Sequence, residues 1–396
     1  MKTVRRILLG MLLVVFGAAM ATIVIYTSMG REYANTLHAL TDSEVTAKTS
    51  ELNQYIEHYF VGDYDETALA DAAADAMVEA TGDRWSYYIS AENYAAHKEQ
   101  MANEYVGVGI TIQKQENGDA YDVIAITPGG SAEEAGVQYG DVLVAVDGVS
   151  IRGTAVAEVR NAVRGEEGTT VVLTVERDGE TLDLTVERRT IPVIVAQGKL
   201  LDGGIGYVTI TNFDANCADH TIAAIEELLD QGATSFVFDV RNNPGGYKSE
   251  LVKVLDYLLP EGPLFRMKST AGEESVDYSE PGCLDLPMTV LVNGDSYSAA
   301  EFFAAAIQEY GAGEVVGTQT CGKGYYQNTY ELSDGSAVAL SSGTYYTPNG
   351  VSLIGTGVVP DVEIDLSEEA QTALLSGRLA VEDDAQLQAA IELLRK

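Results

Sequence analysis

Two residues in the second half of the chain stand in patterns that can carry chemistry, and the first is a lysine. Lys323 lies in GTQTCGKGYYQ, residues 317–327, which fits most of the phosphate-binding pattern G-x-x-x-x-G-K-[S/T]. In a nucleotide-binding loop the lysine opens a helix and is followed by a Ser or Thr that binds magnesium. Here Gly324 follows, and the next stretch, YYQNTYEL, predicts a strand. Lys323 is therefore either an exposed turn residue or a catalytic base, and not a nucleotide ligand.

The second residue is Ser298, which offers a nucleophile for such a base. It follows the apolar stretch VLVNG and begins the predicted helix SAAEFFAAAI. Backbone N–H groups at a helix N-terminus stabilise the negative charge of a tetrahedral intermediate. The same serine also opens an S-x-x-E capping box with Glu301, so a purely structural role stays open, and Ser296 is an alternative nucleophile. The chain has four scattered histidines, so we favour Lys323 as the base, because burial lowers the pKa of a lysine.

A third stretch can supply donors to the oxyanion. DVRNNPGG, residues 239–246, ends a continuous apolar stretch with two glycines, whose backbone can approach a ligand closely. We expect the N–H of Gly245 or Gly246 to act together with the N–H of Ala299 as an oxyanion hole. An ordinary Asn-Pro-Gly turn is the alternative interpretation.

These residues belong to one of several regions with different patterns. Residues 31–100 carry apolar side chains at helical spacing, and residues 101–190 alternate apolar and polar side chains, which predicts a small β-rich module with two helices. Residues 191–366 alternate apolar strands with helices, which is typical of an α/β layered domain, and residues 367–396 end in a predicted helix. The predicted fold class is multidomain α+β.

The N-terminus predicts a membrane anchor. Residues 7–26 carry no charge and follow Lys2, Arg5 and Arg6. A single-pass helix in the cell membrane is therefore expected within residues 1–30, with a cytoplasmic N-terminus and an extracytoplasmic catalytic portion. A cleaved signal peptide is the alternative, because AMA at 19–21 resembles a cleavage site.

Charge and cysteine content narrow the function classes. The 396 residues carry a formal net charge of −36, which disfavours binding to nucleic acid. The three cysteines, at positions 217, 283 and 321, are too few and too far apart to indicate a disulfide framework or a zinc site.

Taken in order, the motifs resemble those of the carboxy-terminal processing proteases, also called tail-specific proteases, which are PDZ-containing serine peptidases with a Ser–Lys dyad. The matching stretches are GDRWSYYIS, YVGVGI, ITPGGSAEEAGVQYGDVLVAVDGVSI, FVFDVRNNPGG, VLVNGDSYSAAE and GKGYYQ. They cover nearly everything after the predicted anchor. The resemblance places the nucleophile at Ser298, the general base at Lys323 and the glutamine that orients this lysine at Gln327.

The resemblance also implies an architecture and partners. It implies a PDZ domain at 101–190, built as a small β-sandwich or barrel, and a crotonase/ClpP-like protease core at 191–366. A protein's C-terminal tail would bind along Tyr105, Val106, Gly107, Val108, Gly109 and Ile110. The resemblance implies no metal and no nucleotide as cofactor. It implies two kinds of partner: a second copy of the chain, bound through the terminal helices, and a regulatory protein.

The sequence departs from the family pattern near the proposed site. Arg84-Trp85 stands in place of Pro-Tyr, Tyr297 in place of a small residue, Ala300 in place of a serine, and Cys321 where Phe is common. None of these departures removes a dyad member, but Tyr297 would narrow the pocket for the substrate residue at the cut. The expected function is a serine endopeptidase that cleaves near protein C-terminal tails. A catalytically inactive, membrane-anchored PDZ scaffold and an acyl-transferring, crotonase-like enzyme are the alternatives.

Overall fold

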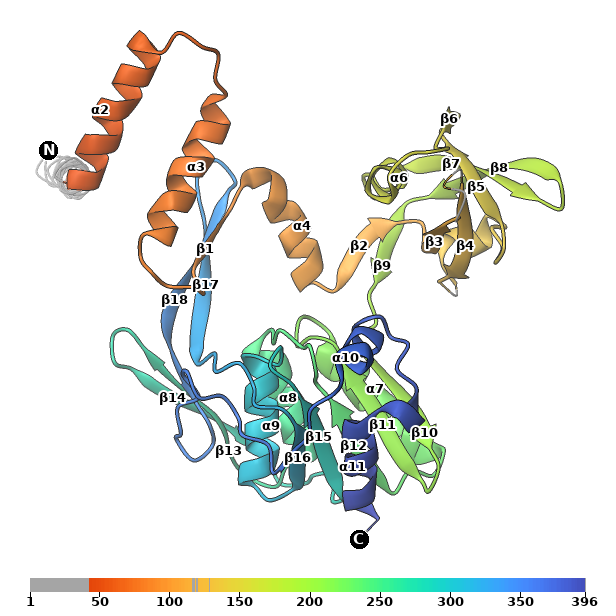
Figure 1. The fold of residues 1–396 in the computed structure, drawn as a ribbon, viewed down its shortest axis with the longest axis vertical. Coiled ribbons are helices and arrows are strands. Elements are labelled where there is room, and N and C mark those ends of the chain that lie inside the picture. Colours follow the sequence, from red (N-terminus) through yellow and green to blue (C-terminus); the bar gives the residue numbers. More distant parts are fainter. Residues whose placement is uncertain (1–42, 116–117, 119, 128, 396) are drawn as a thin grey trace, which may run out of the picture. The chain divides into compact units, whose positions relative to one another are not determined.

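The structure is a computed structural model that describes residues 43–395, apart from positions 116, 117, 119 and 128 (Figure 1). The predicted anchor at 7–26 lies outside the described residues. Among the helices that are described, none is both long and apolar enough to cross a membrane. The chain divides into two units, Met1–Ala70 and Asp71–Lys396.

Helices occupy much of the stretch before residue 101, as the spacing of apolar residues predicts. They are α2 (Glu44–Tyr59), α3 (Glu66–Glu79) and α4 (Ala91–Met101). Helix α2 has no buried residue, and its apolar side chains Val45, Leu52 and Tyr59 are exposed. A short strand, β1 (Tyr87–Ile89), follows the turn that contains the single tryptophan. This strand was not predicted, because its partner lies about 250 positions later in the chain.

The β-rich module forms a sheet of the order β3-β4-β5-β7-β8, with β6 paired to β5. Its strands and helices are β3 (Ile110–Lys114), β4 (Tyr121–Ile126), α5 (Ser131–Glu134), β5 (Val142–Val146), β6 (Val149–Ser150), α6 (Val156–Val163), β7 (Thr170–Arg177) and β8 (Glu180–Glu187). Strand β7 buries Val171, Leu173 and Val175 on one face, which is the period of two expected for a half-buried strand. A separate pair, β2 (Glu104–Gly107) and β9 (Arg189–Pro192), joins the two ends of the module.

The α/β region is built on a sheet of the order β10-β11-β12-β15-β16-β19, which is parallel except for β10 at its edge. The strands are β10 (Ala196–Leu201), β11 (Ile205–Ile210), β12 (Ser235–Asp239), β15 (Met288–Val292), β16 (Gly313–Gly317) and β19 (Val362–Glu363). Strands β12 and β15 are buried at every position, because helices cover both faces of the sheet.

The two faces of this sheet carry different helices. Phe236 and Phe238 of β12 share a core with α7 (Cys217–Asp230), α8 (Lys248–Leu258) and α9 (Ala299–Glu309). Val237, which points to the opposite face, packs with α11 (Ala385–Leu394). The C-terminal helix thus covers its own sheet (Figure 1). Between β19 and α11 lie α10 (Glu368–Leu375) and a 3₁₀ turn at Val381–Asp383.

A second sheet extends from this core. It has the order β1-β18-β13-β14, with β17 paired to β18. The new strands are β13 (Gly262–Ser269), β14 (Glu274–Ser279), β17 (Tyr325–Glu331) and β18 (Ala337–Tyr346). Strand β17 begins two residues after Lys323, so the lysine precedes a strand, as predicted, and not the helix of a nucleotide-binding loop. Because β1 pairs with β18, the turn that contains Trp85 and the Lys323 loop are attached to the same sheet.

Candidate active site

Ser298 occupies a sharp turn between β15 and α9. It is the residue just before the helix, its φ and ψ angles are 58° and −126°, and only 7% of its surface is exposed. A non-glycine residue in such a conformation costs on the order of 1–3 kcal/mol, so the surrounding contacts must hold it. One of them is the hydrogen bond from the N–H of Tyr297 to the carbonyl of Asn243, 3.1 Å, which ties the turn to the DVRNNPGG loop. The serine is thereby presented at the sheet edge where the helix begins.

The carboxylate of Glu301 connects this turn to the lysine loop. One oxygen accepts hydrogen bonds from the backbone N–H groups of Ser298 (2.9 Å) and Lys323 (2.8 Å). The other accepts from the hydroxyl of Thr320 (2.6 Å) and the N–H of Gly322 (2.7 Å). Glu301 is fully buried, and this burial raises its pKa while the four donors lower it. A single side chain therefore holds the proposed nucleophile and the proposed base on adjacent loops.

Sequence reasoning saw Glu301 only as a helix-capping residue. The bond to Ser298 is the one that the S-x-x-E pattern predicts. The bonds to the 320–323 loop were missed, because they link residues about 20 positions apart. A signal was present: a carboxylate within the apolar run AAEFFAAAI needs several donors if the helix is buried on all sides.

The ammonium nitrogen of Lys323 lies against aromatic rings. It is 4.8 Å from the ring centroid of Trp85 and 5.7 Å from that of Tyr297. Burial lowers the pKa of Lys323, whereas Cys321, Glu301 and Asp83 raise it. Within residues 43–395, no hydrogen bond links its Nζ to the Oγ of Ser298. The structure thus brings the two predicted dyad residues onto neighbouring loops, without the bond that proton transfer needs.

Gln327 lies on β17, and its side chain is bonded to the neighbouring strand β18. Its side-chain amide donates to the hydroxyl of Ser341 on β18, 3.1 Å away. The N–H of Ser341 in turn donates to the hydroxyl of Ser86, which donates to the carboxylate of Asp83 at 2.6 Å. Gln327 is therefore linked to the turn that carries Trp85. Among the described residues, its amide makes no hydrogen bond to Lys323, so its orienting role stays a prediction.

The two predicted oxyanion glycines have different surroundings. A Cβ atom at Gly245 would lie 2.7 Å from the Cβ of Ser298 and 2.9 Å from the nitrogen of Ala299, so only glycine allows this approach. The N–H of Gly245 already donates to the side chain of Asn243, at 2.8 Å, which differs from its predicted role as an oxyanion donor. Within the described chain, the N–H groups of Gly246 and Ala299 have no protein acceptor. These two remain the predicted donors.

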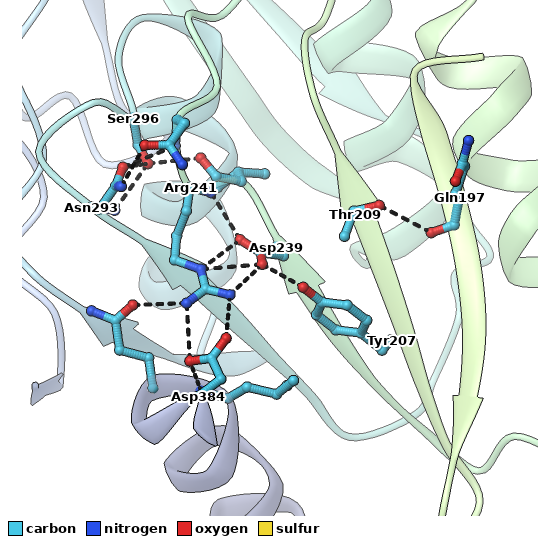
Figure 2. Close-up of polar contacts among 12 residues, drawn as sticks. Gln197, Tyr207, Thr209, Asp239, Arg241, Asn293, Ser296 and Asp384 are labelled. Carbon is cyan, nitrogen blue, oxygen red and sulfur yellow. Dashed lines mark hydrogen bonds and ion pairs between the residues drawn. The ribbon is translucent and has the colours of Figure 1, made fainter. Parts of the chain in front are cut away.

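The hydrogen-bond network in Figure 2 fixes Asp239 and Arg241, at the start of the DVRNNPGG loop. The guanidinium of Arg241 donates to the carboxylates of Asp239 (2.6 Å) and Asp384 (2.8 Å) and to the side chain of Gln386 (2.9 Å). The hydroxyl of Tyr207 donates to Asp239, and the pKa of this tyrosine is raised by burial and by the carboxylate. Because Asp384 and Gln386 belong to the C-terminal segment, this segment is bonded directly to the loop that leads to Gly246.

A groove on the β-rich module includes five of the six residues predicted to bind a peptide. It has a volume of about 250 Å³ and lies between the start of β3 and helix α6. Its lining consists of Tyr105, Gly107, Val108, Gly109, Ile110, Thr111, Ile112, Val156, Arg160, Val163 and Arg164. Val106, the sixth predicted residue, is not part of the lining. In the described residues, no group of three His, Cys, Asp or Glu side chains is arranged to hold a metal.

Comparison with known proteins agrees with this arrangement. Residues 204–364 match the model of peptidase family S41, and residues 123–177 match that of the PDZ domain. The chain is 32% identical over 363 residues to a probable CtpA-like serine protease of Staphylococcus aureus (strain COL), covering 91% of this chain and 72% of that protein. The chain belongs to the carboxy-terminal processing serine proteases. The predicted family, the PDZ module and the mixed α/β protease core are thus confirmed, and the chain is a serine-type peptidase.

Two further proteins are similar to this carboxy-terminal processing protease. A probable CtpA-like serine protease of Staphylococcus saprophyticus is 30% identical over 322 residues, which cover 80% of this chain and 65% of that protein. Among solved structures, a photosystem II D1 C-terminal processing protease is 29% identical, with a TM-score of 0.48, and the match covers 85% of this chain and 91% of that one.

Proposed function

We propose that this protease is an endopeptidase that cuts near protein C-terminal tails, with Ser298 as nucleophile and Lys323 as general base. The observation that carries the proposal is the shared carboxylate of Glu301, which bonds to the backbone N–H of both residues. Burial lowers the pKa of Lys323, which favours the neutral amine that a general base requires.

The reaction then follows from these groups. The neutral amine of Lys323 takes the proton of the Ser298 hydroxyl as the serine oxygen attacks the peptide carbonyl. The N–H groups of Ala299 and Gly246 stabilise the oxyanion of the tetrahedral intermediate. The lysine returns its proton to the leaving amine, and water, activated by the lysine, then hydrolyses the acyl-enzyme. Gln327 is the residue proposed to orient Lys323, and its side chain is bonded to Ser341 on β18.

We propose that the groove on the PDZ module binds the C-terminal tails of substrate proteins and so selects them for cleavage. An extended tail adds as a strand along β3, and the N–H groups near Gly107–Gly109 bind its terminal carboxylate. Val108, Ile110 and Val163 make the groove apolar, so an apolar last residue fits it. The proposal also keeps a membrane anchor at residues 7–26 with an extracytoplasmic protease, a homodimer through terminal helices, and a regulatory protein as partner.

The test compares the full chain with Ser298→Ala and Lys323→Ala variants. Each is incubated with an unfolded protein that ends in apolar residues, and the products are identified by mass spectrometry. We expect cleavage by the parent chain only, with binding of the tail peptide by all three. Near-normal cleavage by Lys323→Ala would disprove the dyad. Tail binding without cleavage by any form would favour the scaffold, and adding a candidate activator protein would then separate a scaffold from a dormant protease.

A further inference from the structure

Two aromatic rings meet at the end of the Lys323 side chain. The rings of Trp85 and Tyr297 have centroids 5.8 Å apart and are tilted by 35°, and the ammonium nitrogen lies within 6 Å of both. Trp85 is held in its turn by the hydrogen bond from its backbone N–H to the carboxylate of Asp83, 3.2 Å. Tyr297 is held by its backbone bond to Asn243. The rings of Trp85 and Tyr297 therefore form an aromatic niche for the ammonium group, and its two walls are fixed by separate segments of the chain.

This arrangement favours the form of Lys323 that cannot act as a base. A cation within about 6 Å of an aromatic centroid is attracted by the ring, and tryptophan attracts it best. The attraction acts on the ammonium and is lost when the amine becomes neutral. Both rings stand where this chain departs from the family motifs, with tryptophan in place of tyrosine at 85 and tyrosine in place of a small residue at 297.

We propose that Trp85 and Tyr297 are positioning residues that hold the protonated Lys323 side chain in an aromatic niche, from which it turns to Ser298 when it loses its proton. This inference rests on the proposed role of Lys323 as general base. Deprotonation removes the attraction to the rings, so the same event creates the base and frees it to move. Loss of the proton and alignment of the dyad are thereby coupled.

Several charged or titratable groups surround the niche. Cys321 on the same loop, Glu301 on α9 and Asp83 on the tryptophan turn all favour the protonated lysine, and burial opposes it. The guanidinium of Arg84 lies 4.2 Å from the Trp85 centroid and donates to the sulfur of Cys321 at 3.6 Å, so a second cation shares the tryptophan. Burial raises the pKa of the Tyr297 hydroxyl, which favours its neutral form.

The tryptophan itself provides a direct readout, because Trp85 is the only tryptophan of the chain. Its fluorescence emission is recorded against pH in the full chain carrying Ser298→Ala, so that no cleavage interferes. We expect a transition that follows the protonation of Lys323. It should vanish when Lys323→Met is added, because methionine keeps the bulk of the side chain without the charge. An unchanged transition in the Lys323→Met chain would overturn the proposal.

A second measurement uses catalysis. Tyr297→Leu keeps an apolar wall but removes the ring, so the acidic limb of the kcat/KM profile should move to lower pH by about 0.5 unit. Tyr297→Phe, which keeps the ring, should leave the limb in place, and Trp85→Phe should shift it less than Trp85→Leu. Identical limbs in all four variants would overturn the niche. A lysine-dependent fluorescence transition without serine-dependent cleavage would instead disprove the proposed function and leave the niche standing.

Discussion

Two buried carboxylate networks hold the loops of the active site, and they work by different physical means. Asp239 and Asp384 pair with the guanidinium of Arg241, so charge balances charge. Glu301 accepts hydrogen bonds from one hydroxyl and three backbone N–H groups, so neutral donors surround the carboxylate. The first network attaches the DVRNNPGG loop to the C-terminal segment, and the second attaches the serine turn to the lysine loop.

The difference teaches where each network is vulnerable. Removing one partner of a buried ion pair leaves an uncompensated charge, and most of the cost falls on stability. Around Glu301 three of the donors are backbone groups, which no ordinary side-chain substitution removes. The network is therefore disrupted mainly by substituting Glu301 itself, and this substitution would change the relative positions of Ser298 and Lys323. We therefore expect the Arg241 network to govern folding and the Glu301 network to govern catalysis.

The largest effect on stability is expected from Arg241→Ala. The guanidinium and its partners Asp239 and Asp384 are nearly inaccessible, with 1%, 6% and 4% of their side chains exposed. The substitution leaves two carboxylates without a cation, which costs roughly 3–5 kcal/mol of unfolding free energy. Urea unfolding followed by circular dichroism measures it. Adding Asp384→Asn to Arg241→Ala should recover part of the loss; if it does not, the network is not held together by charge.

Glu301→Gln should have the next largest effect on stability and a larger effect on activity. The substitution replaces one carboxylate oxygen by an NH₂ group. Each oxygen of Glu301 accepts two hydrogen bonds, so in either orientation of the amide the NH₂ group faces two donors that lose their acceptor. Leaving such donors unsatisfied costs about 1–3 kcal/mol each, so we expect a loss of roughly 3 kcal/mol in unfolding free energy. Turnover should slow by about two orders of magnitude, because the two loops separate and the dyad is misaligned.

Thr320→Val is the comparison variant for Glu301→Gln, because it keeps the carboxylate and removes one of its four donors, together with the acceptor of the Val358 N–H at 2.7 Å. Its loss of unfolding free energy and its effect on turnover should both be smaller. Urea unfolding and steady-state peptide cleavage measure the two quantities for each variant. Equal turnover by Glu301→Gln and Thr320→Val would show that the carboxylate does not align the loops.

A fourth buried carboxylate sharpens the comparison, because it has neither a cation nor a hydrogen-bond donor as partner among the described residues. Asp214 is 6% exposed, and no described residue donates a hydrogen bond to its side chain. Burial raises its pKa to about 7. Since ionisation is harder in the folded state, Asp214 destabilises the fold progressively as pH rises from about 4 through 7. Asp214→Asn should therefore gain up to about 4 kcal/mol of unfolding free energy at pH 8 and almost nothing at pH 4. A gain that is the same at both pH values would show that folding does not shift the pKa of Asp214.

The four buried carboxylates also show how much of the structure can be predicted from the sequence. Most strands and helices follow from local periodicity, but strand β1 does not. The roles of Ser298 and Lys323 were expected from their local motifs and from the resemblance to the family. The long-range contacts of the buried acids could not be predicted, since Asp384 and Arg241 lie 143 positions apart and Glu301 bonds to a loop beyond its own helix. The aromatic niche was missed for the same reason, because Trp85 and Lys323 meet only after β1 pairs with β18. Long-range pairing therefore decides the polar contacts, while periodicity decides the layers.

The smallest effect is expected at the surface, where charges are screened by water. Arg160 is an exposed cation on α6 that lines the PDZ groove, and within the described residues it makes no ion pair. A tail with an acidic side chain near its end should bind better than one with the matching amide, and Arg160→Gln should remove this preference. An exposed pair contributes about 0.2–1 kcal/mol, so the preference should be roughly 1.4- to five-fold. Fluorescence anisotropy of the two peptides measures it, with Arg152→Gln, outside the groove, as the control. If the parent chain and the Arg160→Gln variant preferred the acidic tail equally, Arg160 would not contribute to recognition of the tail. Neither result would bear on the roles of the two buried networks.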